Sequence, residues 1–275
     1  MEEINYALVE ETRPPIYTAM KYWGKKPHNI WRTYLEHYTP DSGLVLDPFA
    51  GSCVSAFEAV KSGKKAIAFD INPLSTFMIE VLSGEFDFEL FSEEANRIIR
   101  LVENDQVYKK YFSTTCPRCM GAAVLQNAKW DEDKLYELGV FCYNHGEQVE
   151  KSLRPPSEID SSLAFESQGI SIPFWFPTDE FPHSPSFTAS FIRRLGGNAF
   201  SDLWTKRNLY VISLIFSEIL KCNNLALQRQ LLFGFTQTIH LCTKMSVPRR
   251  SNANRPFSTS WGRSAYICSA RQMEM

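Results

Sequence analysis

The sequence predicts an α/β fold built on two parallel strands, each followed by an acidic residue. An apolar run at 44–46 ends in Asp47. A small-residue turn at 50–52 then opens a helical pattern, and a second apolar run at 66–69 ends in Asp70. Strand, turn, helix and strand in this order indicate a parallel βαβ unit.

In open α/β sheets, ligands bind in the crevice beyond the carboxyl ends of the strands, where both acids are expected. A carboxylate about 20 residues after a glycine turn is also placed to bind the hydroxyl groups of a ribose. An ordinary βαβ unit with acids facing solvent has the same pattern. The pattern alone therefore leaves a nucleotide site and a plain structural unit both open.

Helical patterns lie within this unit and on both sides of it. The helix of the unit is expected over 55–61, because Gly63 ends its pattern. A helical segment at 30–37 leads into the first strand, and another pattern runs through 93–102.

Residues 47–52 read DPFAGS, and residues 63–73 read GKKAIAFDINP. Together they resemble the cofactor-binding motif of amino-group DNA methyltransferases, a family that uses S-adenosylmethionine. The resemblance extends to residues 22–29, which read YWGKKPHN, since that family has a Lys-Pro element just before this strand, at the methionine end of its cofactor pocket. Over 13–80 the chain looks like the cofactor half of a permuted methyltransferase, in which cofactor motifs precede catalytic ones.

The resemblance implies a cofactor site formed by Lys26, Pro27, Asp47, Phe49, Gly51, Asp70 and Asn72. Asp47 is expected to accept a hydrogen bond from the methionine amino group or to balance the positive charge nearby. Asp70 is expected to accept from both ribose hydroxyls, and Phe49 or Ile71 to pack on adenine. Gly51 lets the backbone approach the ligand closely, because it has no Cβ atom.

Two residues of this site need a further explanation. Lys26 is a cation beside a positively charged sulfonium, so only the carboxylate end of the ligand accounts for it. Cys53 stands where the family has the second glycine of Gly-Ser-Gly, so the turn must accommodate a Cβ atom. The fold class implied is α/β, with an incomplete Rossmann-like sheet of S-adenosylmethionine-dependent methyltransferases, a zinc-ribbon insert and a helical C-terminal part.

Composition and charge exclude some partners. The chain has 275 residues, of which 44% are hydrophobic, and a formal charge of −2. A charge this small gives no global attraction to nucleic acid, so contact with DNA must depend on a local patch. No run approaches the roughly 20 apolar residues that a membrane span needs, and the acidic N-terminal segment lacks a signal-peptide pattern. We expect a cytoplasmic enzyme with no membrane partner.

Three of the seven cysteines belong to a metal-binding pattern. Cys116-Pro-Arg-Cys119 is followed by Cys142-Tyr-Asn-His145. Two such pairs supply the four ligands of a tetrahedral zinc ion, and four protein ligands leave no open position, so the zinc is expected to be structural. Short strands at 122–125 and 139–141 would form the ribbon. A reduced cysteine pair without metal, or a redox pair, is the alternative.

The whole chain is expected to divide into four parts: a cofactor-binding core at 1–110, a zinc-ribbon insert at 111–152, a connecting segment rich in proline and aromatic residues at 153–199, and a helical segment with a basic loop at 200–275. Helices are expected in the last part over 200–220, with Ser201 or Asp202 as the N-cap, and over 225–245.

The basic loop carries Arg249, Arg250, Arg255 and Arg263, with Phe257 and Trp261 between the last two. Arginine supplies phosphate contacts, and an aromatic ring stacks on a base, so the loop is a candidate DNA-binding segment. A solvated loop without a ligand is the alternative.

One expected motif does not occur in the 275 residues. Amino-group methyltransferases carry an Asp/Asn/Ser-Pro-Pro-aromatic tetrapeptide that holds the amine of the flipped base. The Pro-Pro pairs at 14–15 and 155–156 both follow an arginine, and Asn72-Pro73 continues with leucine. We therefore expect a truncated or split enzyme, whose catalytic half lies in a further segment or in a second polypeptide.

Three functions stay open. The favoured hypothesis is the cofactor-binding part of a DNA methyltransferase that acts on adenine N6 or cytosine N4. The second is an RNA or other small-substrate methyltransferase with the same pocket. The third is a zinc-ribbon nucleic-acid-binding protein whose methyltransferase core is a degenerate scaffold. Binding of S-adenosylmethionine separates the first two from the third.

Overall fold

The computed structural model describes residues 3–19, 22, 24–131, 134–145, 150–185, 187–248, 259–261 and 271–274. The chain forms two compact units, the first over Met1–Asp87 and the second over Phe88–Met275. Each unit has its own core and is described separately.

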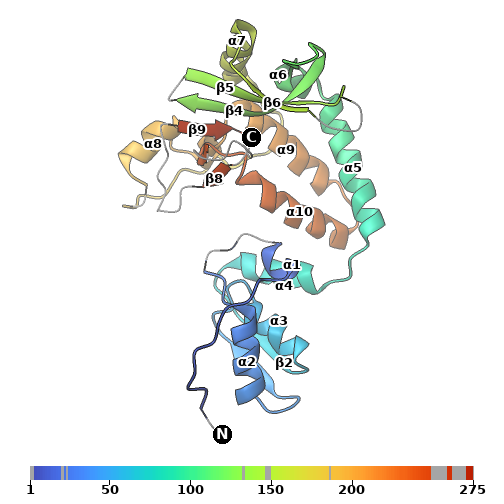
Figure 1. Ribbon diagram of the computed structural model, residues 1–275, viewed down its shortest axis with the longest axis vertical. Helices are drawn as coiled ribbons and strands as arrows, with labels where there is room; N and C mark the ends of the chain where they lie inside the picture. The colour runs from blue at the N-terminus through green and yellow to red at the C-terminus, as the bar shows by residue number, and fades with distance from the viewer. Residues whose placement is uncertain are drawn as a thin grey trace. The chain divides into compact units, whose positions relative to one another are not determined.

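The first unit is a small α/β structure (Figure 1). Its elements are α1 (Pro15–Thr18), α2 (His28–Tyr38), β1 (Leu44–Asp47), α3 (Val54–Lys61), β2 (Lys65–Ala68) and α4 (Pro73–Ser83). Strands β1 and β2 are parallel, with Leu44 opposite Lys65 and Asp47 opposite Ala68. The strands and the helix between them lie within one or two residues of their predicted positions.

Helices α2 and α3 pack against each other and form the core of this unit (Figure 1). Leu35 from α2, Val54 and Ala59 from α3, and Met78 from α4 are all buried. Removing these side chains from water supplies most of the stability of such a small layer. The predicted helix at 30–37 therefore forms, with two more residues at its N-terminal end and one at its C-terminal end.

The second unit combines an antiparallel sheet with helices. Its elements are α5 (Phe88–Asn104), α6 (Gln106–Phe112), β3 (Ser113–Thr115), β4 (Ala122–Asp131), β5 (Lys134–Cys142), β6 (Glu150–Arg154), α7 (Glu158–Glu166), η1 (Ser167–Gly169), α8 (Ala189–Leu195), η2 (Phe200–Leu203), α9 (Lys206–Leu220), α10 (Leu225–Ile239), β7 (Ser246–Pro248), β8 (Thr259–Trp261) and β9 (Arg271–Glu274).

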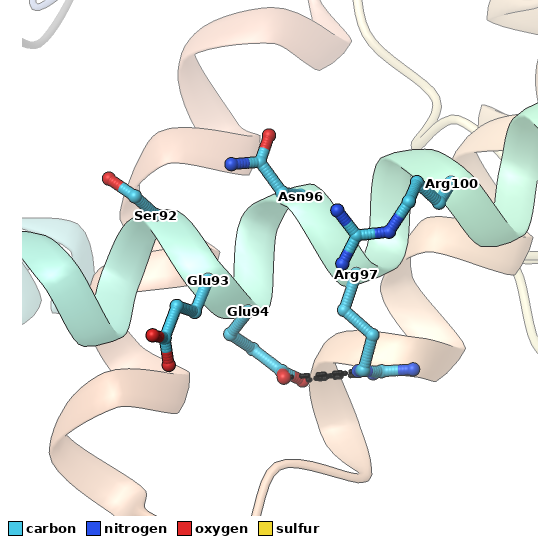
Figure 2. Close-up of a pocket in the computed structure, with 6 residues that line it drawn as sticks. All are labelled: Ser92, Glu93, Glu94, Asn96, Arg97 and Arg100. Carbon is cyan, nitrogen blue, oxygen red and sulfur yellow. Dashed lines mark hydrogen bonds and ion pairs between the residues drawn. The ribbon is translucent and has the colours of Figure 1, made fainter.

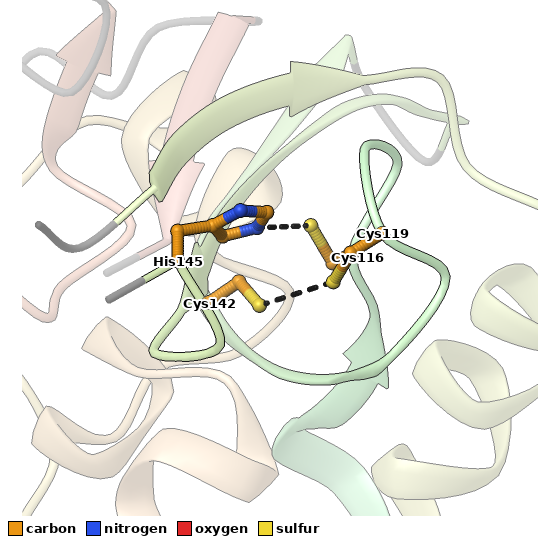
Figure 3. A group of neighbouring side chains, drawn as sticks. All are labelled: Cys116, Cys119, Cys142 and His145. Carbon is orange, nitrogen blue, oxygen red and sulfur yellow. Dashed lines mark hydrogen bonds between the residues drawn. The ribbon is translucent and has the colours of Figure 1, made fainter.

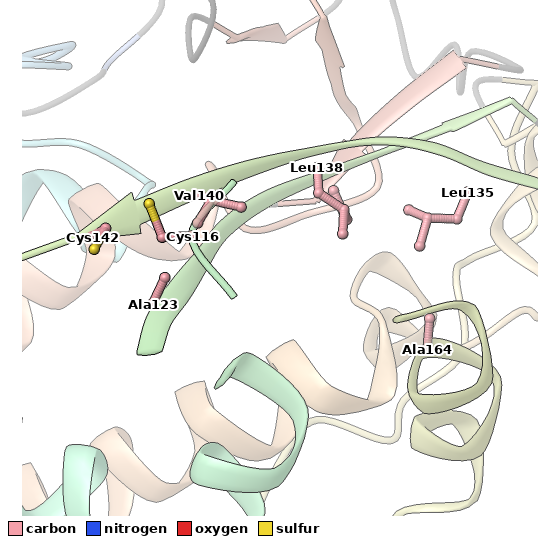
Figure 4. Close-up of a cluster of buried hydrophobic side chains, with 8 residues drawn as sticks. Cys116, Ala123, Leu135, Leu138, Val140, Cys142 and Ala164 are labelled. Carbon is pink, nitrogen blue, oxygen red and sulfur yellow. The ribbon is translucent and has the colours of Figure 1, made fainter. Parts of the chain in front are cut away.

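The sheet has the strand order β3-β4-β5-β6, and β9 pairs with β4. Ala128 of β4 lies opposite Glu274 of β9, so the C-terminal segment closes onto the middle of the unit (Figure 1). One face of the sheet carries a buried cluster that includes Leu138, Val140 and Ala164 of α7, together with Cys116 and Cys142 (Figure 4). Two of the cysteines predicted to bind metal are thus part of this core.

Three helices make a separate core in the second unit. Helix α5 packs against α9 and α10, with Ile98, Ile219, Leu227 and Leu231 buried between them. The predicted helical pattern at 93–102 is therefore the middle of a longer helix, whose apolar face is covered by the two C-terminal helices.

The structure corrects two sequence-based expectations. The helix expected over 200–220 is broken: η2 ends at Leu203, Trp204 is extended, and α9 begins after Thr205, whose side chain accepts a hydrogen bond from the amide of Asn208. Thr205 is thus the N-cap, in place of Ser201 or Asp202. Helix α10 ends at Ile239 and turns follow, so the helix expected to reach 245 is shorter.

The segment 153–199 is more regular than its prolines suggest. It contains α7, whose start is a capping box in which Ser157 and Asp160 exchange hydrogen bonds, and also α8. Proline restricts the residue before it but does not prevent a helix that begins two residues later. Across the described ranges, every helix is too short or too polar to cross a membrane.

Candidate functional site

The two predicted carboxylates lie at one edge of the β1–β2 sheet, because the strands are parallel. Asp47 is the last residue of β1, and Asp70 follows the end of β2 by two residues. The amide of Gly51 donates a hydrogen bond of 2.7 Å to Oδ2 of Asp70, and the amide of Asn72 donates one of 2.8 Å to Oδ1. Asp70 therefore joins the turn after β1 to the segment after β2.

The glycine turn has two residues in the left-handed region. Gly51 has φ +54°, and an added Cβ atom would lie 3.4 Å from Cε1 of Tyr22, so the Tyr22 ring closes one side of the turn. Cys53 has φ +60° and precedes α3 directly. The turn thus accommodates the cysteine that replaces the family's second glycine, although a side chain in this region costs about 1–2 kcal/mol.

The Cys53 side chain is packed inside the first unit. It is fully buried, and its Sγ lies 3.5 Å from the carbonyl oxygens of Gly51 and Ser75. Burial, together with the charges of Asp70 and Asp47, raises the pKa of this thiol to about 11. At neutral pH Cys53 is therefore an uncharged packing residue.

Asp47 is buried and fixed from three sides. Ser55 donates a hydrogen bond to Oδ2, and the amide of Phe49 donates one of 3.0 Å to Oδ1. Lys26 Nζ lies 3.4 Å from Oδ2. Burial opposes ionisation, but these hydrogen bonds and the Lys26 charge outweigh it, so the pKa of Asp47 is below its usual value.

These contacts explain why a cation stands at position 26, a question that the sequence left open. Its ammonium group lies between the carboxylate of Asp47 and the face of Trp31, 4.6 Å from the ring centroid. Pro27 comes next and is the N-cap residue of α2, so the Lys-Pro element is anchored on the helix that packs against α3. Lys26 is thus next to the end of β1 and is paired with an acid.

The other predicted cofactor residues line the same edge or support it. Phe49 is 80% exposed and Ile71 is fully exposed, so both offer apolar surface beside the strand ends. Asn72 uses its side-chain oxygen to cap α4, accepting from the amide of Leu74 at 3.0 Å. Tyr22 and Ser55 contribute to the site but were not predicted, although Tyr22 belongs to the YWGKKPHN stretch.

The four predicted metal ligands come together in the second unit. The sulfur atoms of Cys116, Cys119 and Cys142 and a ring nitrogen of His145 all lie within 4.8 Å of one another. Cys116 and Cys119 come from the turn between β3 and β4, and Cys142 ends β5 (Figure 3). Three thiols and one imidazole are a donor set that suits tetrahedral zinc.

The backbone around these ligands supports the metal hypothesis. The amide of Arg118 points at Cys116 Sγ at 3.4 Å, and the amide of Asn144 points at Cys142 Sγ at 3.5 Å. Hydrogen bonds of this kind stabilise thiolates and orient them toward a metal. An added Cβ atom on Gly121 would lie 3.3 Å from Cys119 Sγ, so the turn is shaped closely around the cluster.

The near matches to the acceptor tetrapeptide have structural roles. Arg13 pairs with Glu10 at 2.7 Å and donates to the carbonyl of Lys25. Arg154 binds Asp160 at 2.8 Å and so joins β6 to the start of α7. The predicted DNA-contact residues Arg249, Arg250 and Arg255 lie outside the described residues.

A hollow of about 520 Å³ lies along α5 (Figure 2). It is lined by Ser92, Glu93, Glu94, Asn96, Arg97 and Arg100. All six side chains come from one helix, and Arg97 is engaged by Glu94 at 2.9 Å and by Glu218 at 3.1 Å. The lining thus includes one ion pair, Glu94 with Arg97, and it contains none of the predicted site residues.

Comparison with known protein families gives one match. Residues 7–76 match the model of the N6/N4 methyltransferase family, which is described as DNA methylase. The matched residues include the Lys-Pro element, the glycine turn and both acids. The resemblance to amino-group DNA methyltransferases is thereby confirmed over this part of the chain. No curated protein and no solved structure matches the chain.

Proposed function

We propose that this chain binds S-adenosylmethionine at the carboxyl ends of β1 and β2 and forms the donor part of an amino-group DNA methyltransferase. Two contacts at this sheet edge carry the proposal. The amide of Gly51 is hydrogen-bonded to Asp70, and Lys26 forms an ion pair with Asp47. The family match over 7–76 supports it, because that match contains all four residues.

The chemistry of the cofactor suits the groups at this edge. Asp70 has lone pairs beyond those that accept from Gly51 and Asn72, and these would accept from the two ribose hydroxyls. Asp47, whose pKa is lowered, would hold the methionine amino group, and Lys26 would hold its carboxylate. Phe49 and Ile71 would pack on the adenine. When bound, the cofactor supplies an activated methyl group on a positively charged sulfur.

The acceptor of the methyl group is proposed to be the exocyclic amine of adenine N6 or cytosine N4 in DNA. No acceptor-Pro-Pro-aromatic tetrapeptide occurs in the 275 residues. We therefore propose that a part outside these 275 residues, either a further segment or a second polypeptide, orients the target amine. We assign phosphate contacts to Arg249, Arg250 and Arg255. Changing Arg249 and Arg250 to alanine should weaken DNA binding and make the binding constant less dependent on salt concentration. An unchanged salt dependence would show that this loop does not contact DNA.

The metal proposed for Cys116, Cys119, Cys142 and His145 is a structural zinc ion. The cluster joins the turn before β4 to the end of β5, and two of its cysteines belong to the buried core of the sheet. Zinc bound there would hold these strands together, as structural zinc does in small modules with little core of their own.

Calorimetric titration of the full chain with S-adenosylmethionine tests the proposed function. We expect saturable binding to one site. Asp47→Ala and Asp70→Ala should each weaken it strongly, whereas Asp41→Ala, which removes an exposed carboxylate in the turn before β1, should leave it unchanged. Absence of heat up to about 1 mM ligand, a limit that corresponds to about −4 kcal/mol, would overturn the proposal.

A further inference from the structure

A buried carboxylate behind the donor pocket has no role in the contacts described so far. Glu58 lies on α3, the helix that starts at the glycine turn, and it is fully buried. Its Oε1 accepts from the Tyr17 hydroxyl and from Lys61 Nζ at 3.1 Å, and its Oε2 accepts from Arg32 Nε at 2.6 Å.

The charge on Glu58 is maintained by these partners. Burial alone would favour the neutral acid, but the bonds from Tyr17, Lys61 and Arg32 outweigh it and hold the pKa of Glu58 below its usual value. Packing two helices does not require an ion at this position, since an apolar side chain of similar size usually serves a buried face at least as well. The carboxylate therefore calls for an explanation other than packing.

The partners of Glu58 lie on both sides of the Lys-Pro element. Tyr17 belongs to α1, before the element, and Arg32 belongs to α2, after it. The carbonyl of Tyr17 accepts a 2.6 Å hydrogen bond from Lys25 Nζ. The carbonyl of Lys25 in turn accepts from Arg13 at 3.1 Å. One carboxylate on α3 thus holds the two ends of the segment that contains Lys26.

This segment makes the contacts that define the donor pocket. Lys26 reaches Asp47 from it, and the Tyr22 ring lies against the Gly51 turn. Lys26 contacts the end of β1, and Tyr22 contacts the turn that follows it. If the segment shifted on α3, Lys26 would lose its contact with Asp47, although β1 and β2 themselves would stay paired.

We propose that Glu58 is a positioning residue for the donor pocket: it fixes Tyr17 and Arg32 on α3, so that Lys26, which lies between them in the sequence, meets the methionine end of S-adenosylmethionine. This inference rests on the proposed function. It assigns to Glu58 no contact with the cofactor. Its effect passes through Tyr17 and Arg32 to the Lys-Pro element.

Two ligands separate positioning from a general structural role. S-adenosylmethionine contains the methionine end that Lys26 would bind. 5′-Methylthioadenosine contains the same adenosine but lacks the amino acid. In the full chain, Glu58→Gln should weaken S-adenosylmethionine binding about tenfold or more while leaving 5′-methylthioadenosine binding within about twofold, a difference that calorimetry measures directly. Tyr17→Phe, which removes one hydroxyl and keeps the ring, should act in the same direction.

Glu36→Gln is the matched control. Glu36 also links α2 to the end of α3, through a 3.2 Å bond from Ser62, but it is exposed and lies outside the segment between Tyr17 and Arg32. It should leave both affinities unchanged. Equal losses for the two ligands in Glu58→Gln and Tyr17→Phe, or no loss, would overturn the positioning role. A wild-type chain that binds neither ligand would overturn the donor pocket itself, and this inference with it.

Discussion

The backbone amide of Gly51 donates a 2.7 Å hydrogen bond to Oδ2 of Asp70. This bond joins the turn after the first strand to the segment after the second, across 19 positions of sequence. Gly51 and Asp70 therefore form one structural unit, and moving either one moves the other. The same bond holds the turn and the acid together at the edge of a sheet of only two strands, where we propose that the ribose binds.

The glycine turn can be tested with a matched pair of substitutions. Gly51 and Gly63 both have positive φ, at +54° and +73°, so alanine at either position should cost about 1 kcal/mol of stability. At Gly63 nothing lies within 4 Å of an added Cβ atom, whereas at Gly51 the methyl group would contact Tyr22. The midpoint temperature of thermal unfolding should fall by a similar amount in both variants. Only Gly51→Ala should lose affinity for S-adenosylmethionine. Equal affinities in the two variants would contradict the role of the turn.

Cys53 should be chemically inert in the folded protein. A rise in its pKa from 9.0 to about 11 lowers the thiolate fraction at pH 8 about a hundredfold, and the side chain is buried as well. Iodoacetamide at pH 8 should therefore label the partly exposed Cys222 and leave Cys53 unlabelled until the chain unfolds. Mass spectrometry of labelled peptides measures both rates, and similar rates would show that the turn opens in solution.

Metal content tests the cysteine–histidine cluster. The purified chain should hold about one zinc ion, and His145→Ala should weaken zinc binding by on the order of a hundredfold. Cys222→Ser, which removes a thiol outside the cluster, should have no effect. Because Cys116 and Cys142 belong to the sheet core, chelation should expose apolar surface to a reporter dye (Figure 4). Less than half an equivalent of zinc in the wild type would refute the site.

The stability of the second unit should depend on pH through Asp160. Burial opposes its ionisation, but Arg154 and Ser157 outweigh this and lower the pKa of Asp160 to about 2. A folded-state pKa below the unfolded value of about 4 gives stability that is complete above pH 4 and is lost as pH falls toward 2.

The free energy of unfolding of wild type minus that of Asp160→Asn measures this contribution. The difference should be about 2 kcal/mol larger at pH 5 than well below pH 2, and about half of that should be lost by pH 3. Taking the difference cancels the acid sensitivity of other groups, including the metal ligands. A difference that stays constant from pH 5 to pH 3 would contradict the lowered pKa.

The local pattern of the sequence was sufficient for the βαβ unit. Alternation between apolar runs, a glycine turn and a helix places Asp47 and Asp70 at the same sheet edge, because parallel strands end together. Spacing was likewise sufficient for the four metal ligands to be proposed as one group. These features depend on residues close in sequence or on simple topology.

Other features depend on distant contacts that no local pattern contains. The partner of Lys26 is known only when the Lys-Pro element is folded onto β1, and the burial of Glu58 only when α1 and α2 pack on α3. Pairing of β9 with β4 joins residues at least 140 positions apart. Helix α7 does not depend on a distant contact of this kind. Its capping box, formed by Ser157 and Asp160, is a local pattern that directly follows two prolines in the sequence.

The most direct test of the donor site is the preference for a ribose hydroxyl. The measurement is the ratio of affinities for S-adenosylmethionine and its 2′-deoxyribose analogue, taken in wild type, Asp70→Ala and Asp41→Ala. A ratio within one variant cancels any general loss of binding. A hydrogen bond to a charged acceptor contributes about 1.5–3 kcal/mol, so wild type and Asp41→Ala should prefer the hydroxylated ligand at least about tenfold. Asp70→Ala should show almost no preference; the same preference in all three proteins would contradict the assignment of Asp70 to the ribose.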